Sequence, residues 1–113
     1  MKYLFRGGTV VSGRGTRRAD VLVEDEKILR VARSITAPEA AVIDVEGQLL
    51  LPGFIDAHIH LESSLVSPKE FAKAVLPHGT TTVITDPHEI TNVMGTDGIE
   101  YMLQATEDLP VDV

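Results

Sequence analysis

The sequence contains no cysteine and no tryptophan, and aromatic residues make up only 4% of its 113 residues. The lack of cysteine excludes disulfide scaffolds, cysteine-ligated zinc, thiol nucleophiles and iron–sulfur clusters. Few aromatic rings and a net charge of −7 argue against binding to nucleic acid. No apolar run approaches the roughly 20 residues of a membrane-spanning helix, and the apolar stretch at Tyr3–Phe5 is too short for a signal peptide. We therefore expect a cytoplasmic protein that binds neither nucleic acid nor a membrane.

The residues that are present have the composition of an ordinary globular protein, with 43% hydrophobic and 24% charged side chains. Their charge is unevenly distributed. Residues 1–33 contain eight Lys or Arg and four Asp or Glu, whereas residues 34–113 contain two Lys or Arg and thirteen Asp or Glu. Two solvated surfaces of different sign would explain this pattern. Alternatively, some acids of the second segment are metal or substrate ligands, and the motifs in which they occur distinguish the two explanations.

Residues 1–51 carry short β-branched or apolar runs separated by turn signals. These runs predict strands at Tyr3–Phe5, Thr9–Val11, Ala19–Val23, Lys27–Val31 and Ala41–Val45. The pair Gly7-Gly8 is expected to form a turn between the first two. We predict a β-rich segment, either a small meander or half of a β-sandwich, which is too small to bury much core by itself.

Strand-like and helical segments alternate in residues 52–113. A buried strand is expected at Phe54–His60. The run Ser67-Pro68-Lys69-Glu70 has the cap, the proline and the glutamate of a helix start. Thr80–Thr85, β-branched at nearly every position, predicts a second buried strand. Residues 86–95 are predicted to form a loop, 97–107 a helix and 111–113 the beginning of a third strand.

This alternation is typical of a parallel α/β sheet or barrel. A (β/α)8 barrel takes about 250 residues, so residues 52–113 would supply about a quarter of one. Because the sequence stops where a strand begins, we expect a fragment of a longer protein.

Two histidines, His58 and His60, lie two positions apart on the first predicted strand of the second segment. Side chains at i and i+2 share one face of a strand, with Cα atoms roughly 6.5–7 Å apart, so both imidazoles can reach one metal ion. Two polar residues on a solvated face are the alternative. The apolar neighbours of these histidines favour a buried strand, where imidazoles need partners.

Three ionisable residues, Asp86, His88 and Glu89, follow the second predicted strand. In barrels, catalytic residues lie at the carboxyl ends of the strands. The alternative is a simple turn formed by Asp86 and Pro87. We expect Asp86 to be near a metal, either as a ligand or orienting a ligand, and His88 and Glu89 to be catalytic.

The run Glu62-Ser63-Ser64 follows the paired histidines. These polar side chains are candidates for binding substrate, and the alternative is that they cap local structure. His78, between Pro77 and Gly79 at a predicted helix end, is interpreted as structural, because a cation there suits the helix dipole.

The run Pro52-Gly53-Phe54-Ile55-Asp56-Ala57-His58-Ile59-His60 resembles the first-strand signature of the amidohydrolase superfamily. The segments Glu62–Ser64, Pro77–Thr82 and Asp86–Val93 further resemble the bacterial and archaeal adenine deaminases of that superfamily. The resemblance implies a β-sandwich, of which residues 1–51 would be half. It also implies a metal-bearing (β/α)8 barrel, to which residues 52–113 would contribute two β/α units and the start of the third strand.

The resemblance also implies an activity, namely metal-dependent hydrolysis of adenine to hypoxanthine and ammonia. His58 and His60 would be ligands of the first metal, with manganese or iron favoured over zinc. The remaining ligands of the family lie on later strands that this sequence does not contain, so we expect the chain to be inactive alone. It would then self-associate as a homo-oligomer or pair with the remainder of the barrel.

Two alternatives stay open. Another amidohydrolase, similar to dihydroorotase or N-acetylglucosamine-6-phosphate deacetylase, would share the paired histidines, but the Asp86–Val93 run is not expected there. The second alternative is a catalytically incomplete fragment that acts only as a folding or association module.

Overall fold

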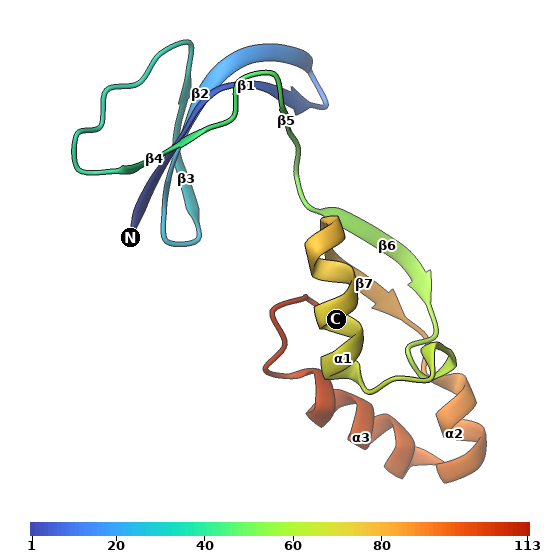
Figure 1. The fold of residues 1–113 in the computed structure, drawn as a ribbon. Coiled ribbons are helices and arrows are strands. Elements are labelled where there is room, and N and C mark those ends of the chain that lie inside the picture. The colour runs from blue at the N-terminus through green and yellow to red at the C-terminus, as the bar shows by residue number, and fades with distance from the viewer. The chain divides into compact units, whose positions relative to one another are not determined.

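The computed structural model describes all residues from Met1 to Val113 and divides into two units (Figure 1). The β-rich unit comprises Met1–Pro52, and the α/β unit comprises Gly53–Val113. None of the helices combines the length and the apolar character needed to cross a membrane.

The β-rich unit is a single sheet built around its first strand. Strands β1, β2 and β3 form an antiparallel meander, whereas β4 and β5 pair with β1 in parallel, and the order of the main path is β3-β2-β1-β4. The strands predicted at Ala19–Val23, Lys27–Val31 and Ala41–Val45 are found as β2, β3 and β4, but those predicted at Tyr3–Phe5 and Thr9–Val11 are one continuous strand, and β5 was not predicted. The five strands are β1 (Lys2–Ser12), β2 (Gly15–Glu24), β3 (Lys27–Ala32), β4 (Ala41–Asp44) and β5 (Leu49–Leu50).

The predicted turn at Gly7-Gly8 is wrong, because β1 continues through both residues. The register of β1 against β2 shifts between Phe5 and Gly8, as in a β-bulge, and Gly7 has a φ of 78° that glycine adopts without strain. The buried carboxylate of Asp20 accepts a hydrogen bond from the Gly7 N–H (2.9 Å) and another from the Ile35 N–H (2.9 Å). A side chain 13 residues away in the sequence therefore stabilises the bulge.

The α/β unit begins with two parallel strands, and a third segment pairs with the second. Asp112 forms an isolated parallel bridge with Thr82 of β7, at the place where the beginning of a third strand is predicted. The elements are β6 (Phe54–Ile59), η1 (Glu62–Ser64), α1 (Pro68–Val75), η2 (Leu76–His78), β7 (Thr80–Thr85), α2 (His88–Met94) and α3 (Thr96–Thr106).

The start of α1 is as the sequence predicts. The Ser67 side chain accepts a hydrogen bond from the Glu70 N–H (3.4 Å), and Pro68 occupies the first helical turn. The Glu70 side chain, however, accepts from Lys73 instead of returning to the cap, so only half of the capping box forms. The core against which the helices pack consists of Leu61, Phe71, Ala72, Val83, Met102 and Val111.

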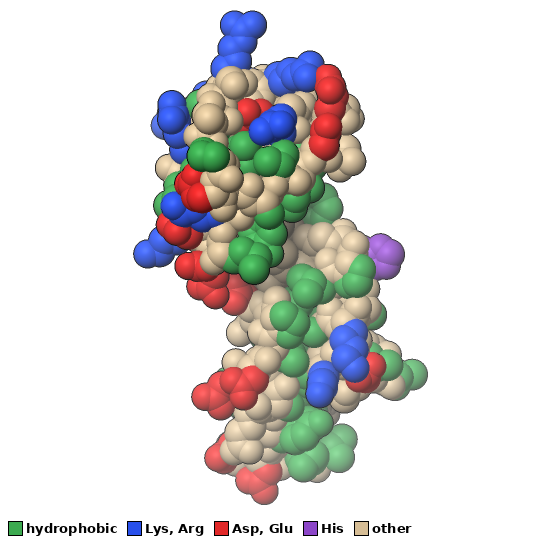
Figure 2. Space-filling model, turned by 60° about the vertical axis from the view of Figure 1, so that its left-hand side comes forward, with side chains coloured by type: hydrophobic (Ala, Val, Ile, Leu, Met, Phe, Trp, Pro, Cys, Tyr) green, Lys and Arg blue, Asp and Glu red, His purple; other side chains and the backbone are tan.

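Two expectations for the α/β unit are wrong. Residues 86–95 are not a loop, since His88–Met94 form α2. The strands are not fully buried either, because Phe54, Ile55 and Ile84 are more than half exposed. β6 pairs only with β7, so its other edge is unpaired. Figure 2 shows hydrophobic side chains reaching the surface of this unit.

Candidate metal centre

The parallel pairing of β6 and β7 brings their carboxyl ends together. Ile59 lies opposite Thr85 in the register, and the Asp86 N–H donates to the Ile59 carbonyl oxygen (3.1 Å) just past the strands. The next residue, His60, directs its Nδ1 at the Asp86 carbonyl oxygen (2.7 Å). A carbonyl can only accept, so Nδ1 carries the proton and Nε2 keeps its lone pair for a ligand.

His88, the first residue of α2, completes a cluster of three side chains. Its Nδ1 lies 3.0 Å from Oδ2 of Asp86, and its ring centroid is 4.5 Å from that of His60. The potential ligand atoms of His60, Asp86 and His88 all lie within 4.8 Å of one another. We call these three residues the His–Asp–His cluster. The Asp86 carboxylate holds the Nδ1 proton of His88, which leaves a second Nε2 free.

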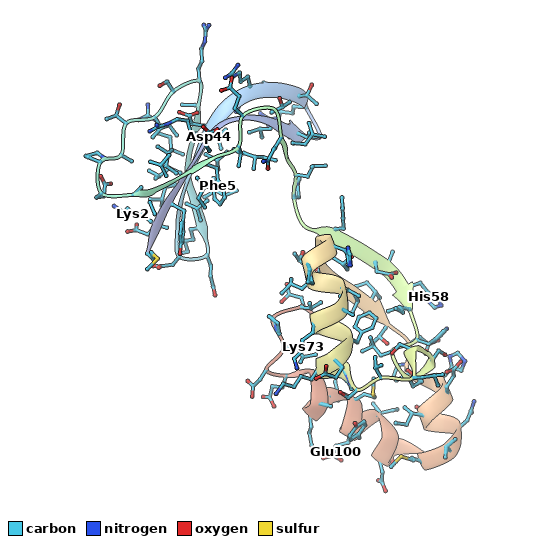
Figure 3. The ribbon with its side chains drawn as sticks, viewed as in Figure 1. Lys2, Phe5, Asp44, His58, Lys73 and Glu100 are labelled. Atoms are coloured by element: carbon cyan, nitrogen blue, oxygen red, sulfur yellow. The ribbon has the colours of Figure 1, made fainter.

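His58 lies next to this cluster. Figure 3 labels His58 near the end of β6. Its ring centroid is 4.9 Å from that of His60, edge to face, so the structure brings the paired histidines together as expected. The side chain is exposed near the end of β6, and the His58 N–H donates to the Asp56 carboxylate (3.1 Å). His58 can thus approach an ion at the cluster edge but is not part of the tightest group of ligand atoms.

The electrostatic surroundings of His60 favour positive charge. The hydrogen bond to the Asp86 carbonyl raises the pKa of the His60 imidazole above its usual value, and the carboxylates of Asp86, Glu89 and Glu62 raise it further. Partial burial acts in the opposite direction. The negative field that stabilises a proton on His60 also stabilises a divalent cation at the same place.

The predicted substrate-binding residues have mostly intramolecular partners. Glu62 Oε1 accepts from the backbone N–H groups of Glu89 (3.1 Å) and Ile90 (3.2 Å), and the Ser63 hydroxyl donates to the Glu89 carboxylate. The Ser64 hydroxyl donates to the Leu61 carbonyl oxygen (2.5 Å). The Ser64 hydroxyl therefore has a partner in the neighbouring backbone.

The residues present fit a divalent transition metal. Imidazole nitrogens with one carboxylate are the donor set that suits zinc, iron and manganese. Two buried oxygens, Glu62 Oε2 and Thr85 Oγ1, have no hydrogen-bond partner. Thr85 directly precedes Asp86, and its unpaired hydroxyl could not be predicted from the sequence, because a threonine in a β-branched run is expected to pack.

Comparison with known proteins gives consistent matches. Residues 49–113 match the Amidohydrolase family. Adenine deaminase from Halalkalibacterium halodurans is 49% identical over 98 residues, which is 87% of this chain and 17% of that protein. Adenine deaminase from Bacillus subtilis is 62% identical over 72 residues, which is 64% of this chain and 12% of that protein. The resemblance read from the motifs is confirmed, and the chain spans less than a fifth of either relative's length.

The fold is similar to that of solved structures of hydrolases. Dihydropyrimidinase from Brevibacillus agri is 32% identical with a TM-score of 0.73, and the match covers 93% of this chain and 24% of that one. The family match and the similarity to this solved structure both support the expected α/β amidohydrolase fold.

Proposed function

Because this chain belongs to the amidohydrolase family, a family of metal-dependent hydrolases, we propose that it provides the first metal-binding strand of an enzyme that converts adenine to hypoxanthine. The observation that carries the choice of substrate is the 49% identity to an adenine deaminase over 98 residues. The geometry that supports metal chemistry is the His–Asp–His cluster at the ends of β6 and β7, with His58 beside it.

In the proposed reaction, water adds to C6 of adenine and the exocyclic amine leaves as ammonia. His58 and His60 would hold a divalent ion through imidazole nitrogens. When bound, such an ion would lower the pKa of a water molecule so that hydroxide is available near neutral pH. Asp86 orients His60 through its carbonyl oxygen and His88 through its carboxylate.

The proton that leaves the attacking water must reach the departing amine. His88 and Glu89 are the groups that can carry it, because both are exposed at the carboxyl end of β7. The Ser63 hydroxyl fixes the Glu89 carboxylate, and Asp86 fixes the ring of His88. Both groups are therefore oriented before substrate binds, which lowers the entropic cost of proton transfer.

The wider architecture is part of the same proposal. We infer that Met1–Pro52 forms half of a β-sandwich and that Gly53–Val113 forms two β/α units of a (β/α)8 barrel. Exposed Phe54, Ile55 and Ile84 would then be covered by further elements of that fold or by a second copy. Manganese or iron is the proposed metal, and a chain of these 113 residues alone is proposed to lack deaminase activity.

Hydrolysis of a cyclic amide is the second candidate. It is favoured by the 32% identity to dihydropyrimidinase, which extends over 93% of this chain. The two reactions differ in substrate, so one purified protein can be tested for both.

The test uses the native polypeptide that carries this sequence, isolated by an antibody and reconstituted with Mn²⁺, Fe²⁺ or Zn²⁺. We expect ammonia and hypoxanthine from adenine and no ring opening of dihydrouracil. Replacing His60 by Asn should abolish turnover. The matched variant His78→Asn, at the end of η2 outside the cluster, should leave it unchanged. Turnover of dihydrouracil alone would favour the second candidate, and full activity of H60N would refute the proposed centre.

A further inference from the structure

The first turn of α2 has no cap from its own sequence. Pro87 occupies the N-cap position, and no side chain there accepts a hydrogen bond. The first N–H groups of a helix have no partner within it and need an acceptor from elsewhere. In this helix the acceptor is Glu62, whose Oε1 binds the N–H groups of Glu89 (3.1 Å) and Ile90 (3.2 Å) from 27 and 28 residues away.

A second hydrogen bond runs in the opposite direction. Ser63, next to Glu62 in η1, donates its hydroxyl to the Glu89 side chain. The three bonds together join η1 to the first turn of α2, and we call them the η1–α2 lock. The second oxygen of the same carboxylate, Glu62 Oε2, is buried without a hydrogen-bond partner.

Apolar packing contributes little to the position of α2. The helix has no buried residue, and Val93 and Met94 are exposed. Ile90 packs partly against the core, and its backbone approaches α3 so closely that a Cβ at Gly98 would lie 2.9 Å from the Ile90 carbonyl oxygen. Besides the packing of Ile90, the lock is what holds the amino-terminal end of α2 through hydrogen bonds from another element.

That end of the helix carries His88. His88 precedes Glu89 directly, and its ring lies 4.5 Å from that of His60. A displacement of the first turn would move the His88 ring away from Asp86 and His60. Glu62 can therefore act on the cluster without touching the ion or the substrate.

We propose that Glu62 is a positioning residue, which caps α2 across the η1–α2 lock and so holds His88 in the His–Asp–His cluster. This role replaces the substrate-binding role expected from the sequence. It rests on the proposed metal centre but not on adenine being the substrate.

The test compares three variants of the native polypeptide. Glu62→Ala removes the acceptor, and Ser63→Ala removes the reverse bond. Glu62→Gln keeps an acceptor oxygen but removes the charge. Glu100→Gln is the matched control, because Glu100 is an exposed carboxylate on α3 that accepts only from Gln104 (3.3 Å). The readouts are Mn²⁺ titration followed by electron paramagnetic resonance, amide hydrogen exchange in α2, and kcat and KM for adenine.

We expect E62A to weaken Mn²⁺ binding by at least about tenfold, because His88 fixes the side chain of Asp86, whose carbonyl oxygen orients the proposed ligand His60. Amide exchange at Glu89 and Ile90 should accelerate in parallel. E62Q should lose less than about fivefold in affinity, because a neutral acceptor is weaker but still present. S63A should fall between the two, and E100Q should match the wild type.

Equal losses in E62Q and E62A would mean that the charge matters and not the cap, which overturns the proposal. A raised KM in E62A with unchanged metal affinity and amide exchange would also overturn it, in favour of substrate binding. If E62A fails to fold, S63A still tests the lock. Amide hydrogen exchange in α2 that is the same in S63A as in the wild type would contradict the lock. If the wild type does not deaminate adenine but the metal and exchange results hold, the proposed function fails and this inference stands.

Discussion

Each of the two units contains a carboxylate that accepts two backbone N–H groups from distant segments, but the two carboxylates are used differently. Asp20 in the β-rich unit is 6% exposed and binds Gly7 with one oxygen and Ile35 with the other. Glu62 in the α/β unit binds Glu89 and Ile90 with a single oxygen, and its second oxygen is buried without a partner.

The difference indicates where ligand chemistry is located. In the β-rich unit both oxygens of the buried acid accept backbone hydrogen bonds, so this acid serves the fold. All four histidines belong to the α/β unit, and two of them have an Nδ1 occupied by Asp86 and a free Nε2. Unused lone pairs at converging strand ends are the mark of a binding site.

The largest expected effect comes from removing the buried carboxylate of Asp20. Asp20→Ala leaves two backbone N–H groups without their charged acceptor, which should lower the free energy of unfolding of the β-rich unit by about 3 kcal/mol. Urea unfolding followed by circular dichroism measures the loss. The exposed Glu26→Gln is the control, and an unchanged midpoint in D20A would show that Asp20 does not stabilise the bulge.

Replacing a proposed ligand in the other unit should affect metal binding and spare the fold. His60→Asn removes the imidazole at the centre of the cluster, and we expect Mn²⁺ affinity to fall by about 100-fold, the upper end of the range for groups around a metal. The urea midpoint of the β-rich unit should not move. Retained affinity in H60N would locate the metal elsewhere, and H78N serves as the control.

A smaller effect is expected at a helix start. Ser67→Ala removes the acceptor for the Glu70 N–H and should destabilise the α/β unit by about 1 kcal/mol. Thermal unfolding of S67A, compared with Ser34→Ala in an exposed bend of the β-rich unit, measures the difference. Equal melting temperatures for the two variants would argue against the cap.

The smallest expected effect is a change in the pKa of two exposed glutamates, Glu70 and Glu39, when the lysine beside each is replaced. The Lys73 ammonium, which donates to Glu70 (2.7 Å), holds the pKa of that carboxyl below its usual value. The pKa of Glu39 is also lowered, first by a hydrogen bond from its own backbone and second by Lys2. Carbon-detected NMR titration should therefore show that Lys73→Met returns Glu70 nearly to its usual pKa, whereas Lys2→Met returns Glu39 only in part.

The sign of the stability change follows from these lowered pKa values. A carboxyl whose pKa is lower in the folded state stabilises the protein above its unfolded pKa, about 4.3 for Glu. That contribution is lost as the pH falls through the lower, folded value. A Glu70 pKa that does not respond to K73M would contradict the assigned cause.

The sequence predicts the elements whose signals are local. The cap at Ser67, the β-branched run of β7 and the paired histidines are read from neighbouring residues, and each is found where expected. Helix α2 could not be predicted, because its cap is Glu62, 27 residues earlier in the chain. The bulge at Gly7 was missed for the same reason, since Asp20 stabilises it from another strand.

The candidate site also has features that neighbouring residues predict and features that depend on distant ones. The residue types at Asp86 and His88 predict a polar cluster, but their grouping with His60 depends on the register of β6 against β7. The exposure of Phe54 and Ile55 was not foreseen, because a sequence pattern shows that a side chain is apolar but not which element covers it.

The central claim is that the ends of β6 and β7 hold a divalent ion. Anomalous X-ray diffraction at the manganese edge, from crystals of the native polypeptide prepared with Mn²⁺, tests it most directly. We predict an ion within coordination distance of Nε2 of His60, with His58, Asp86 or His88 beside it. An ion bound only at other residues, or none at this position with His60 bound to protein groups alone, would contradict the account.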